Sequence, residues 1–186
     1  HVNLPWTNGF SEDLKKAIRR KAMEAWEIPN VDFKMRENGE WRTRNSDEFF
    51  NGKKVILFSL PGAFTPTCSE FQLPGYEANY EKFKEAGIDE IYCISVNDAF
   101  VMNAWAKDQN IEKVKMLPDG SGKFTRGMGM LVEKDDKGFG YRSWRYAAVI
   151  QNGKVIDFFE EPGFADNCTT DPFEVSGAEN VLNTLK

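Results

Sequence analysis

The chain has 186 residues, of which 41% are hydrophobic and 28% are charged, a composition typical of one globular domain with its own core. The net charge of −5 argues against nucleic acid as the main partner. No apolar run approaches the about 18 residues of a membrane span, so we expect none. His1 is the only histidine, which leaves a Cys–His protease pair without a partner inside the chain.

The chain has three cysteines, Cys68, Cys93 and Cys168, at wide spacing and without a C-x-x-C motif. They do not supply the four ligands of a zinc site, and the glycine-rich phosphate-binding motifs are absent. We therefore expect no metal and no cofactor. An odd, sparse cysteine count suits a reducing compartment, which predicts a cytoplasmic protein.

Residues 1–30 are predicted to be an N-terminal extension, and residues 31–186 a single α/β domain. Within the extension a helix is expected to begin at Ser11, with an apolar stripe of Leu14, Ile18 and Ala22. Its other face carries five basic residues: Lys15, Lys16, Arg19, Arg20 and Lys21. Such a helix packs on the domain or a partner chain, or docks on an acidic surface or anionic membrane. These interpretations stay open.

The domain then alternates predicted strands and helices. Two strands flank the Asn38-Gly39 turn, and a turn with a short helix in NSDEFFNGKK follows. The apolar runs VILFSL and EIYCISV are expected to be strands buried on both faces. Between them, SEFQLPGYEANYEKFKEAG has the pattern of a helix bent by Pro74.

The second half continues with a helix at DAFVMNAWAKDQN, a strand at VKMLPD and a helical turn at GKFTRGMGM. RSWRYAAVIQNGKVIDFFEE is predicted to be a hairpin about Asn152-Gly153. A last helix follows, with Ser176 and Glu179 as a capping box. The whole predicts an α/β fold with a central mixed sheet, helices on both faces and an antiparallel hairpin at one side.

The loop PGAFTPTCSEF follows the first buried strand and places Cys68 at the start of a helix. Thr65 is the natural N-cap, and Pro66 suits the first turn because its missing N–H is not needed there. Free backbone N–H groups and the positive end of the helix dipole then favour a thiolate at Cys68 over a thiol. The alternative is an inert, buried cysteine.

The stretch FSLPGAFTPTCS resembles the active-site loop of the peroxiredoxins, thiol peroxidases of the thioredoxin-like fold. ISVNDAFVMNAW, PDGSGKFTRGMGM, GFGYRSWRY and DPFEVSGAENVL are similar to the branch that contains peroxiredoxin 5, plant type II peroxiredoxins and bacterial peroxiredoxin–glutaredoxin fusions. The resemblance runs from about Val31 to Leu185. It implies a homodimer that reduces hydrogen peroxide and organic hydroperoxides.

Four site residues follow from this resemblance. Cys68 matches the peroxidatic cysteine, which becomes a sulfenic acid, and Thr65 matches the hydroxyl that binds the peroxide. Pro61 matches the proline that shields the pocket. Arg145, in RSWRY, matches the arginine beside the thiolate, where a guanidinium favours the thiolate and donates to peroxide oxygens.

Two further expectations concern the neighbours of Arg145, and a third concerns three apolar residues. Arg142 lies three residues away on one predicted strand, so it faces the other way and should be a solvated surface charge. If Asn152-Gly153 closes a two-residue hairpin, Glu160 lies opposite Arg145, and we hypothesise that it orients the guanidinium. The apolar residues that line either a substrate pocket or the core are Phe64, Phe124 and Leu131.

The sulfenic acid must be reduced. Cys93 lies in an apolar strand and is expected to be a buried structural thiol. Cys168, in the polar loop FADNCTTDP, lies close to where animal-type members of the branch carry a resolving cysteine. Two routes stay open: a Cys68–Cys168 disulfide, or direct reduction of Cys68 by glutathione, glutaredoxin or thioredoxin. No glutaredoxin domain follows Lys186, so a glutaredoxin would be a separate protein, or the sequence is part of a longer chain.

A thioredoxin-like disulfide exchange enzyme is disfavoured because C-x-x-C is absent. A non-catalytic interaction or chaperone-like protein, docked through its N-terminal helix, is the alternative from another class. The intact set of Pro61, Thr65, Cys68 and Arg145 argues against a degenerate site.

Overall fold

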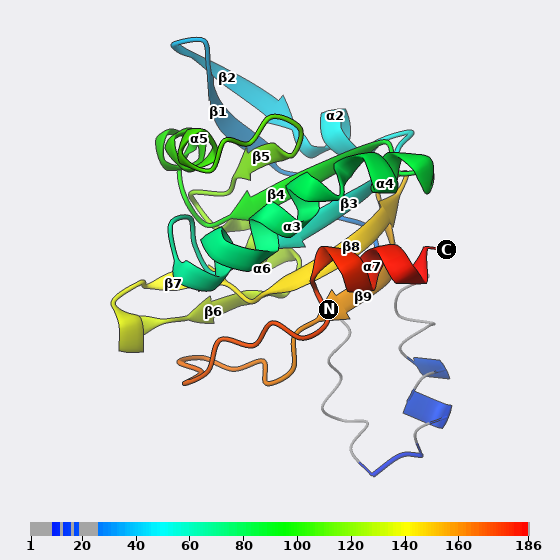
Figure 1. Cartoon of the computed structure of the whole chain (residues 1–186). Coiled ribbons are helices and arrows are strands. Elements are labelled where there is room, and N and C mark those ends of the chain that lie inside the picture. Colours follow the sequence, from blue (N-terminus) through cyan, green and yellow to red (C-terminus); the bar gives the residue numbers. More distant parts are fainter. Residues whose placement is uncertain (1–8, 12, 16, 19–25, 186) are drawn as a thin grey trace.

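The computed structural model describes residues 9–11, 13–15, 17–18 and 26–185. Its centre is a five-stranded sheet in the order β5-β4-β3-β8-β9 (Figure 1). The middle strand β3 (Lys54–Ser59) pairs in parallel with β4 (Glu90–Ser95), which pairs in parallel with β5 (Lys115–Pro118). On its other side β3 pairs antiparallel with β8 (Tyr146–Gln151), and β8 with β9 (Lys154–Glu160). The predicted mixed sheet is confirmed.

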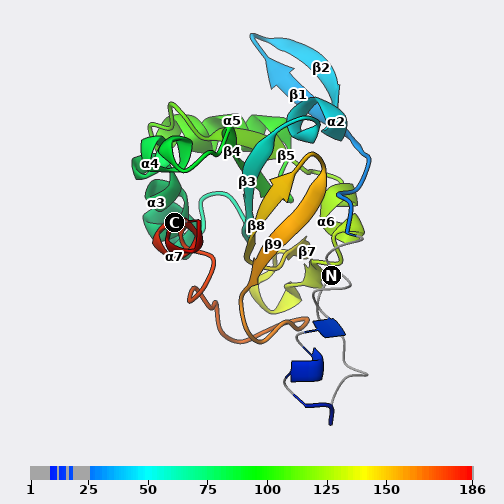
Figure 2. The same ribbon diagram turned by 90° about the vertical axis from the view of Figure 1, so that its right-hand side faces the viewer.

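Helices cover both faces of this sheet (Figure 2). Alternate β3 side chains face opposite ways, so Ile56 and Phe58 enter one core cluster, and Val55 and Leu57 enter the other. We call the first the helix-rich core, because it also takes side chains from α3 (Leu73–Ala78), α4 (Tyr80–Glu85), α5 (Ala99–Asp108) and α7 (Ala178–Thr184). The second, here the α2–α6 core, takes side chains from α2 (Ser46–Phe50) and α6 (Lys123–Gly127).

Two small antiparallel pairs flank the central sheet. The predicted hairpin is present as β1 (Asp32–Glu37) and β2 (Glu40–Asn45), joined at Asn38 and Gly39, both with positive φ. The other pair, β6 (Leu131–Glu133) and β7 (Tyr141–Ser143), encloses the short helix η3 (Asp135–Lys137) and was not expected. Strands of three residues are too short to show an alternating pattern in the sequence.

The segment that carries Cys68 is not the single helix bent at Pro74 that the sequence predicts. It begins at Pro66, passes through a π-helical turn, η2 (Cys68–Gln72), into α3, and breaks at Asn79 before α4. In the π turn the Leu73 N–H donates to the Cys68 carbonyl. Pro74 lacks the N–H that an α-helix would need at that position. The sequence therefore correctly predicted an irregular helix near Pro74, but the irregularity is a π-helical turn and not a bend.

The β8–β9 hairpin contains a bulge that changes the predicted register. Its two-residue turn, Asn152-Gly153, is confirmed, with Gln151 opposite Lys154. Ile150 pairs with Val155 but Val149 pairs with Asp157, which leaves one extra residue on β9. Glu160 therefore lies opposite Tyr146, and the hypothesis that it faces Arg145 is wrong.

The last helix also starts differently from the prediction. α7 begins at Ala178 after Gly177, and no side chain caps it. Ser176 cannot form the predicted capping box, because its hydroxyl donates to the Glu161 carboxylate at 2.7 Å. A tertiary hydrogen bond has replaced a local one.

The described part of the N-terminal extension begins its helix at Ser11, whose hydroxyl accepts the Leu14 N–H at 3.3 Å. Ala22 and the basic residues 16 and 19–21 lie outside the described residues, so the role of that helix stays a prediction. From Trp26 onward the chain contacts the domain: the Trp26 ring lies 4.7 Å from that of Phe158, and the Ile28 N–H donates to Gly153. No helix in the described ranges is long and apolar enough to cross a membrane.

Candidate active site

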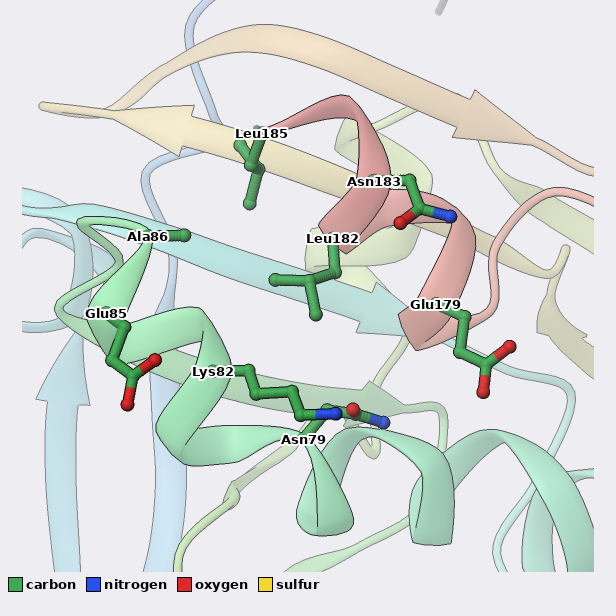
Figure 3. A pocket seen from close by; sticks show the side chains of 8 residues that line it. All are labelled: Asn79, Lys82, Glu85, Ala86, Glu179, Leu182, Asn183 and Leu185. Atoms are coloured by element: carbon green, nitrogen blue, oxygen red, sulfur yellow. The ribbon is translucent and has the colours of Figure 1, made fainter.

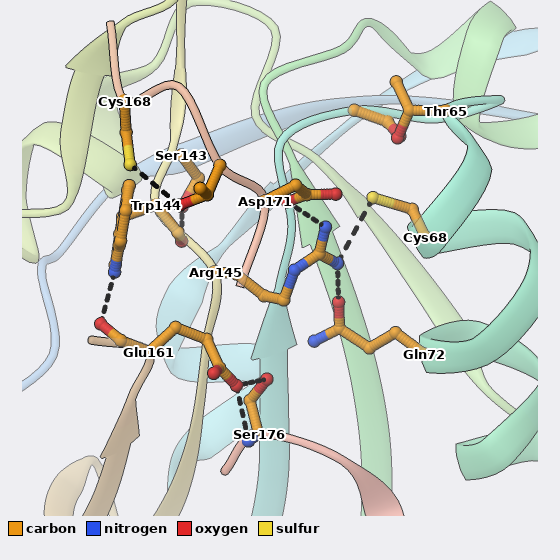
Figure 4. A network of polar contacts seen from close by, with 12 residues as sticks. Thr65, Cys68, Gln72, Ser143, Trp144, Arg145, Glu161, Cys168, Asp171 and Ser176 are labelled. Carbon is orange, nitrogen blue, oxygen red and sulfur yellow. Dashed lines mark hydrogen bonds and ion pairs between the residues drawn. The ribbon is translucent and has the colours of Figure 1, made fainter. Parts of the chain in front are cut away.

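The loop between β3 and the Cys68 helix is folded tightly (Figure 4). Pro61 and Gly62 are buried, and Phe64 has φ of 65°, a left-handed conformation that is unusual for an aromatic residue. The Thr65 hydroxyl donates to the Gly62 carbonyl at 2.7 Å, and the Thr65 carbonyl accepts the Ser69 N–H at 3.0 Å. Thr65 therefore precedes the helix as predicted, but its side chain holds the loop instead of capping the helix.

Cys68 and Arg145 lie together in the interior, as the resemblance implied. The Cys68 side chain is fully buried and Arg145 is 2% exposed. Arg145 Nη1 donates to Cys68 Sγ at 3.4 Å and also to Gln72 Oε1. The Gln72 amide in turn donates to the Ser59 carbonyl at 3.4 Å. A permanent cation is thus held against the sulfur and cannot be screened by water.

The second half of the guanidinium is held by a residue that sequence reasoning missed. Arg145 Nη2 forms an ion pair with Asp171 Oδ1 at 2.7 Å (Figure 4), and the Phe173 ring centroid lies 5.8 Å from the guanidinium carbon. Burial alone would lower the pKa of Arg145, but the charges of Cys68 and Asp171 raise it above its ordinary value. Gln72 was missed as well; a polar residue within an apolar helical stripe was its only signal.

Arg142 is not the solvated surface charge that we predicted. It is half-buried and donates to the Pro61 carbonyl at 3.1 Å and to the Phe139 carbonyl at 3.2 Å. Burial lowers the pKa of its guanidinium, and the charge of Cys68 opposes that shift. The prediction placed both arginines on one strand, whereas β7 ends at Ser143 and Arg145 precedes β8. Both side chains therefore approach the Cys68 loop.

The other two cysteines occupy different surroundings. Cys93 is fully buried in the helix-rich core with Cys68, and burial, followed by the charge of Cys68, raises the pKa of its thiol well above the usual value. Cys168 is half-buried and packs against the α2–α6 core. A hydrogen bond with Thr170 Oγ1 at 3.5 Å is the first cause of its lowered pKa. In Figure 4, Cys168 lies beside Trp144, and Asp171 lies between it and Cys68 in this view.

The pockets described below are not lined by Phe64, Phe124 or Leu131, the residues predicted to line either an apolar substrate pocket or the core. Phe124 is fully buried in the α2–α6 core, away from the core that holds Cys68, whereas Phe64 is 52% exposed. A groove of about 590 Å³ lies between α4 and α7 (Figure 3), away from the sulfur. A small cavity directly beside Arg145 is lined by Pro61, Lys134, Trp144, Arg145, Asp171 and Pro172. Within the described residues, no group of three or more His, Cys, Asp or Glu side chains could hold a metal ion.

Comparison with known proteins identifies the family to which the chain belongs. The Redoxin family model matches residues 23–182. A peroxiredoxin of Rhizobium etli is 59% identical over 169 residues, which are 86% of this chain and 94% of that protein.

Two solved structures are also similar. The antioxidant protein of Plasmodium falciparum, a 1-Cys peroxiredoxin, has a TM-score of 0.81 and 40% identity and covers 86% of this chain and 97% of its own. Reduced Prx3 of Vibrio vulnificus in complex with hydrogen peroxide has a TM-score of 0.78 and 41% identity, with coverage of 86% and 96%. The chain belongs to the Redoxin family and, within it, to the peroxiredoxins, thiol-dependent peroxidases of the thioredoxin-like fold.

Proposed function

We propose that Cys68 is the thiol that reduces the peroxide. Its thiolate attacks one oxygen of a hydroperoxide, a sulfur–oxygen bond forms and the oxygen–oxygen bond breaks. The electron pair leaves with the second oxygen as hydroxide or alkoxide, and Cys68 becomes a sulfenic acid. The observation that carries this proposal is the 3.4 Å contact between Cys68 Sγ and the buried Arg145 guanidinium.

The neighbouring groups have complementary roles in this step. Arg145 stabilises the thiolate and, as charge moves to the leaving oxygen, donates to that oxygen. The Thr65 hydroxyl already donates to Gly62, so its lone pairs can accept a hydrogen bond from the peroxide O–H. Pro61 is buried and lines the small cavity beside Arg145, where it shields the sulfur from bulk water.

For the return to the thiol we favour an external reductant, namely glutathione, glutaredoxin or thioredoxin. A first thiol attacks the sulfenic acid and releases water, and a second thiol breaks the resulting mixed disulfide. Cys168 packs against the α2–α6 core while Cys68 lies in the helix-rich core, so a disulfide between them would require the loop to rearrange. The similar Plasmodium protein is named a 1-Cys peroxiredoxin. We expect a homodimer from the family resemblance, and a cytoplasmic protein from the odd, sparse cysteine count.

Rapid mixing of the reduced protein with hydrogen peroxide tests the proposal. Wild type and Cys168→Ser should oxidise quickly, and Cys68→Ser should not. Mass spectrometry should find the added oxygen on the peptide that contains Cys68. Oxidation of the wild type no faster than that of a free thiol, or fast oxidation of Cys68→Ser, would refute the assignment.

A further inference from the structure

We propose that Asp171 is a positioning residue for peroxide reduction: its carboxylate fixes the Arg145 guanidinium in the orientation that directs Nη1 at the Cys68 sulfur. The inference rests on the function proposed for Cys68 and Arg145, and adds to it a residue from a different segment of the chain. Asp171 lies in the long connection between β9 and α7.

The contacts of the guanidinium show why one carboxylate matters. Nη1 is shared between Cys68 Sγ and Gln72 Oε1, and Nη2 is held by Asp171 at 2.7 Å. The third nitrogen, Nε, is buried without a hydrogen-bond partner among the described residues. Without Asp171, the planar group would be fixed through Nη1 alone and could turn about that point. At 2% exposure of Arg145, little water is available to replace the lost contact.

The segment around Asp171 is itself tied down. On one side, the buried Glu161 carboxylate accepts the backbone N–H groups of Glu174 at 2.6 Å and Ser176 at 2.8 Å. On the other side, Asp166 Oδ1 accepts the Glu133 N–H at 2.8 Å. The Asp171 side chain is 39% exposed, so burial does not dictate its position. Its placement against Arg145 therefore comes from a loop anchored at both ends.

Charge balance through the reaction gives a second reason. Before the reaction, both the Cys68 thiolate and the Asp171 carboxylate face the Arg145 cation. Once Cys68 becomes a neutral sulfenic acid, the thiolate charge is gone. A buried cation without a partner is strongly unfavourable, and Asp171 remains as its counter-charge. The pair thus keeps Arg145 neutralised and in place until the thiol is restored.

The test compares Asp171→Ala and Asp171→Asn in a Cys168→Ser background. Two rates are measured at Cys68: oxidation by hydrogen peroxide, and alkylation by iodoacetamide, which is neutral and does not need oriented donors. We expect Asp171→Ala to slow oxidation by about 10–100-fold, because a misplaced Arg145 guanidinium no longer donates to the leaving oxygen in the transition state. The rate of alkylation should change far less. Asp171→Asn retains the acceptor oxygen and should recover most of the oxidation rate.

Two controls make the result decisive. Glu174→Ala removes an exposed carboxylate from the same segment but keeps the backbone N–H that Glu161 accepts, and should leave the ratio of the two rates unchanged. Melting temperatures identify any variant that unfolds. An oxidation rate of Asp171→Ala equal to that of its background, or an equal loss of both rates, overturns the inference. If Arg145→Ala and Cys68→Ser also oxidise normally, the proposed function itself has failed.

Discussion

Gly62 faces the guanidinium of Arg142 so closely that a Cβ carbon at residue 62 would overlap Nη1. That nitrogen cannot easily withdraw, because it donates to the Pro61 carbonyl at 3.1 Å while Arg142 Nε donates to Phe139. A glycine next to Pro61 is therefore required by a side chain 80 residues further along the chain. The two residues together fix the loop that covers Cys68.

Gly62→Ala should consequently lower the free energy of unfolding by about 1–3 kcal/mol, as overpacking does, and slow peroxide reduction. Adding Arg142→Ala removes the overlapping nitrogen, so the double variant should be more stable than the sum of the two single changes predicts. Urea unfolding of the four proteins measures this coupling. Gly75→Ala is the matched control, because its Cβ would meet only Ala178 at an ordinary 3.7 Å. Strict additivity of the two changes would contradict the clash.

Arg145→Lys tests whether charge alone or the planar guanidinium is needed beside Cys68. Lysine keeps the positive charge but cannot contact Cys68, Gln72 and Asp171 at once, as Arg145 does. We expect the second-order rate constant with hydrogen peroxide to fall by about 100-fold or more, as when one oxyanion donor is removed. Stopped-flow kinetics gives the rate, with the exposed Arg126→Lys as the control. An unchanged rate would mean that any cation suffices.

Glu161 should be a large contributor to the stability of the fold. It is fully buried, and its carboxylate accepts three successive backbone N–H groups and the Ser176 hydroxyl. Glu161→Gln replaces one acceptor oxygen with a donor that faces these groups. We expect a loss of about 1.5–3 kcal/mol in the free energy of unfolding. The exposed Glu179→Gln should change it little, and equal losses in both variants would refute the special role of Glu161.

The sequence predicted what depends on local pattern. Apolar runs identified β3 and β4, Asn-Gly pairs identified both hairpin turns, and Cys68 was placed correctly at a helix start. These signals come from neighbouring residues, and no distant contact opposes them. The helix predicted at DAFVMNAWAKDQN is present as α5, and Asp98 caps it by accepting the Val101 N–H at 2.9 Å.

The errors arose where distant residues decide the outcome. One extra residue in β9 moved Glu160 away from Arg145, and no local pattern marks a bulge inside an apolar strand. Ser176 was drawn from helix capping to Glu161 by a tertiary hydrogen bond. Arg142 was judged from strand alternation that stops at Ser143. Asp171 meets Arg145 only because the loop folds back, which spacing along the chain cannot show.

The thiol of Cys168 should titrate at lower pH than an ordinary cysteine because Thr170 hydrogen-bonds the thiolate. A hydrogen bond to the charged form stabilises it, so removing the hydroxyl must raise the pKa. Thr170→Val should therefore move the midpoint of Cys168 alkylation to higher pH. The measurement uses iodoacetamide and peptide mass spectrometry over a pH series. Thr67→Val, on another segment, is the control, and a midpoint that Thr170→Val leaves unmoved would contradict the assigned cause.

The fate of Cys68 after one turnover decides between the two reductive routes. Because Cys68 and Cys168 pack against opposite cores, we expect the monomer treated with one equivalent of hydrogen peroxide to gain one oxygen atom, not to lose two hydrogens. Trapping with a sulfenic-acid reagent should label wild type and Cys168→Ser equally, and Cys68→Ser not at all. Turnover with glutathione and glutaredoxin should likewise be the same in wild type and Cys168→Ser. Loss of two hydrogens in the wild type but not in Cys168→Ser would instead establish the internal disulfide, and would mean that the Asp171 loop leaves Arg145 in every cycle.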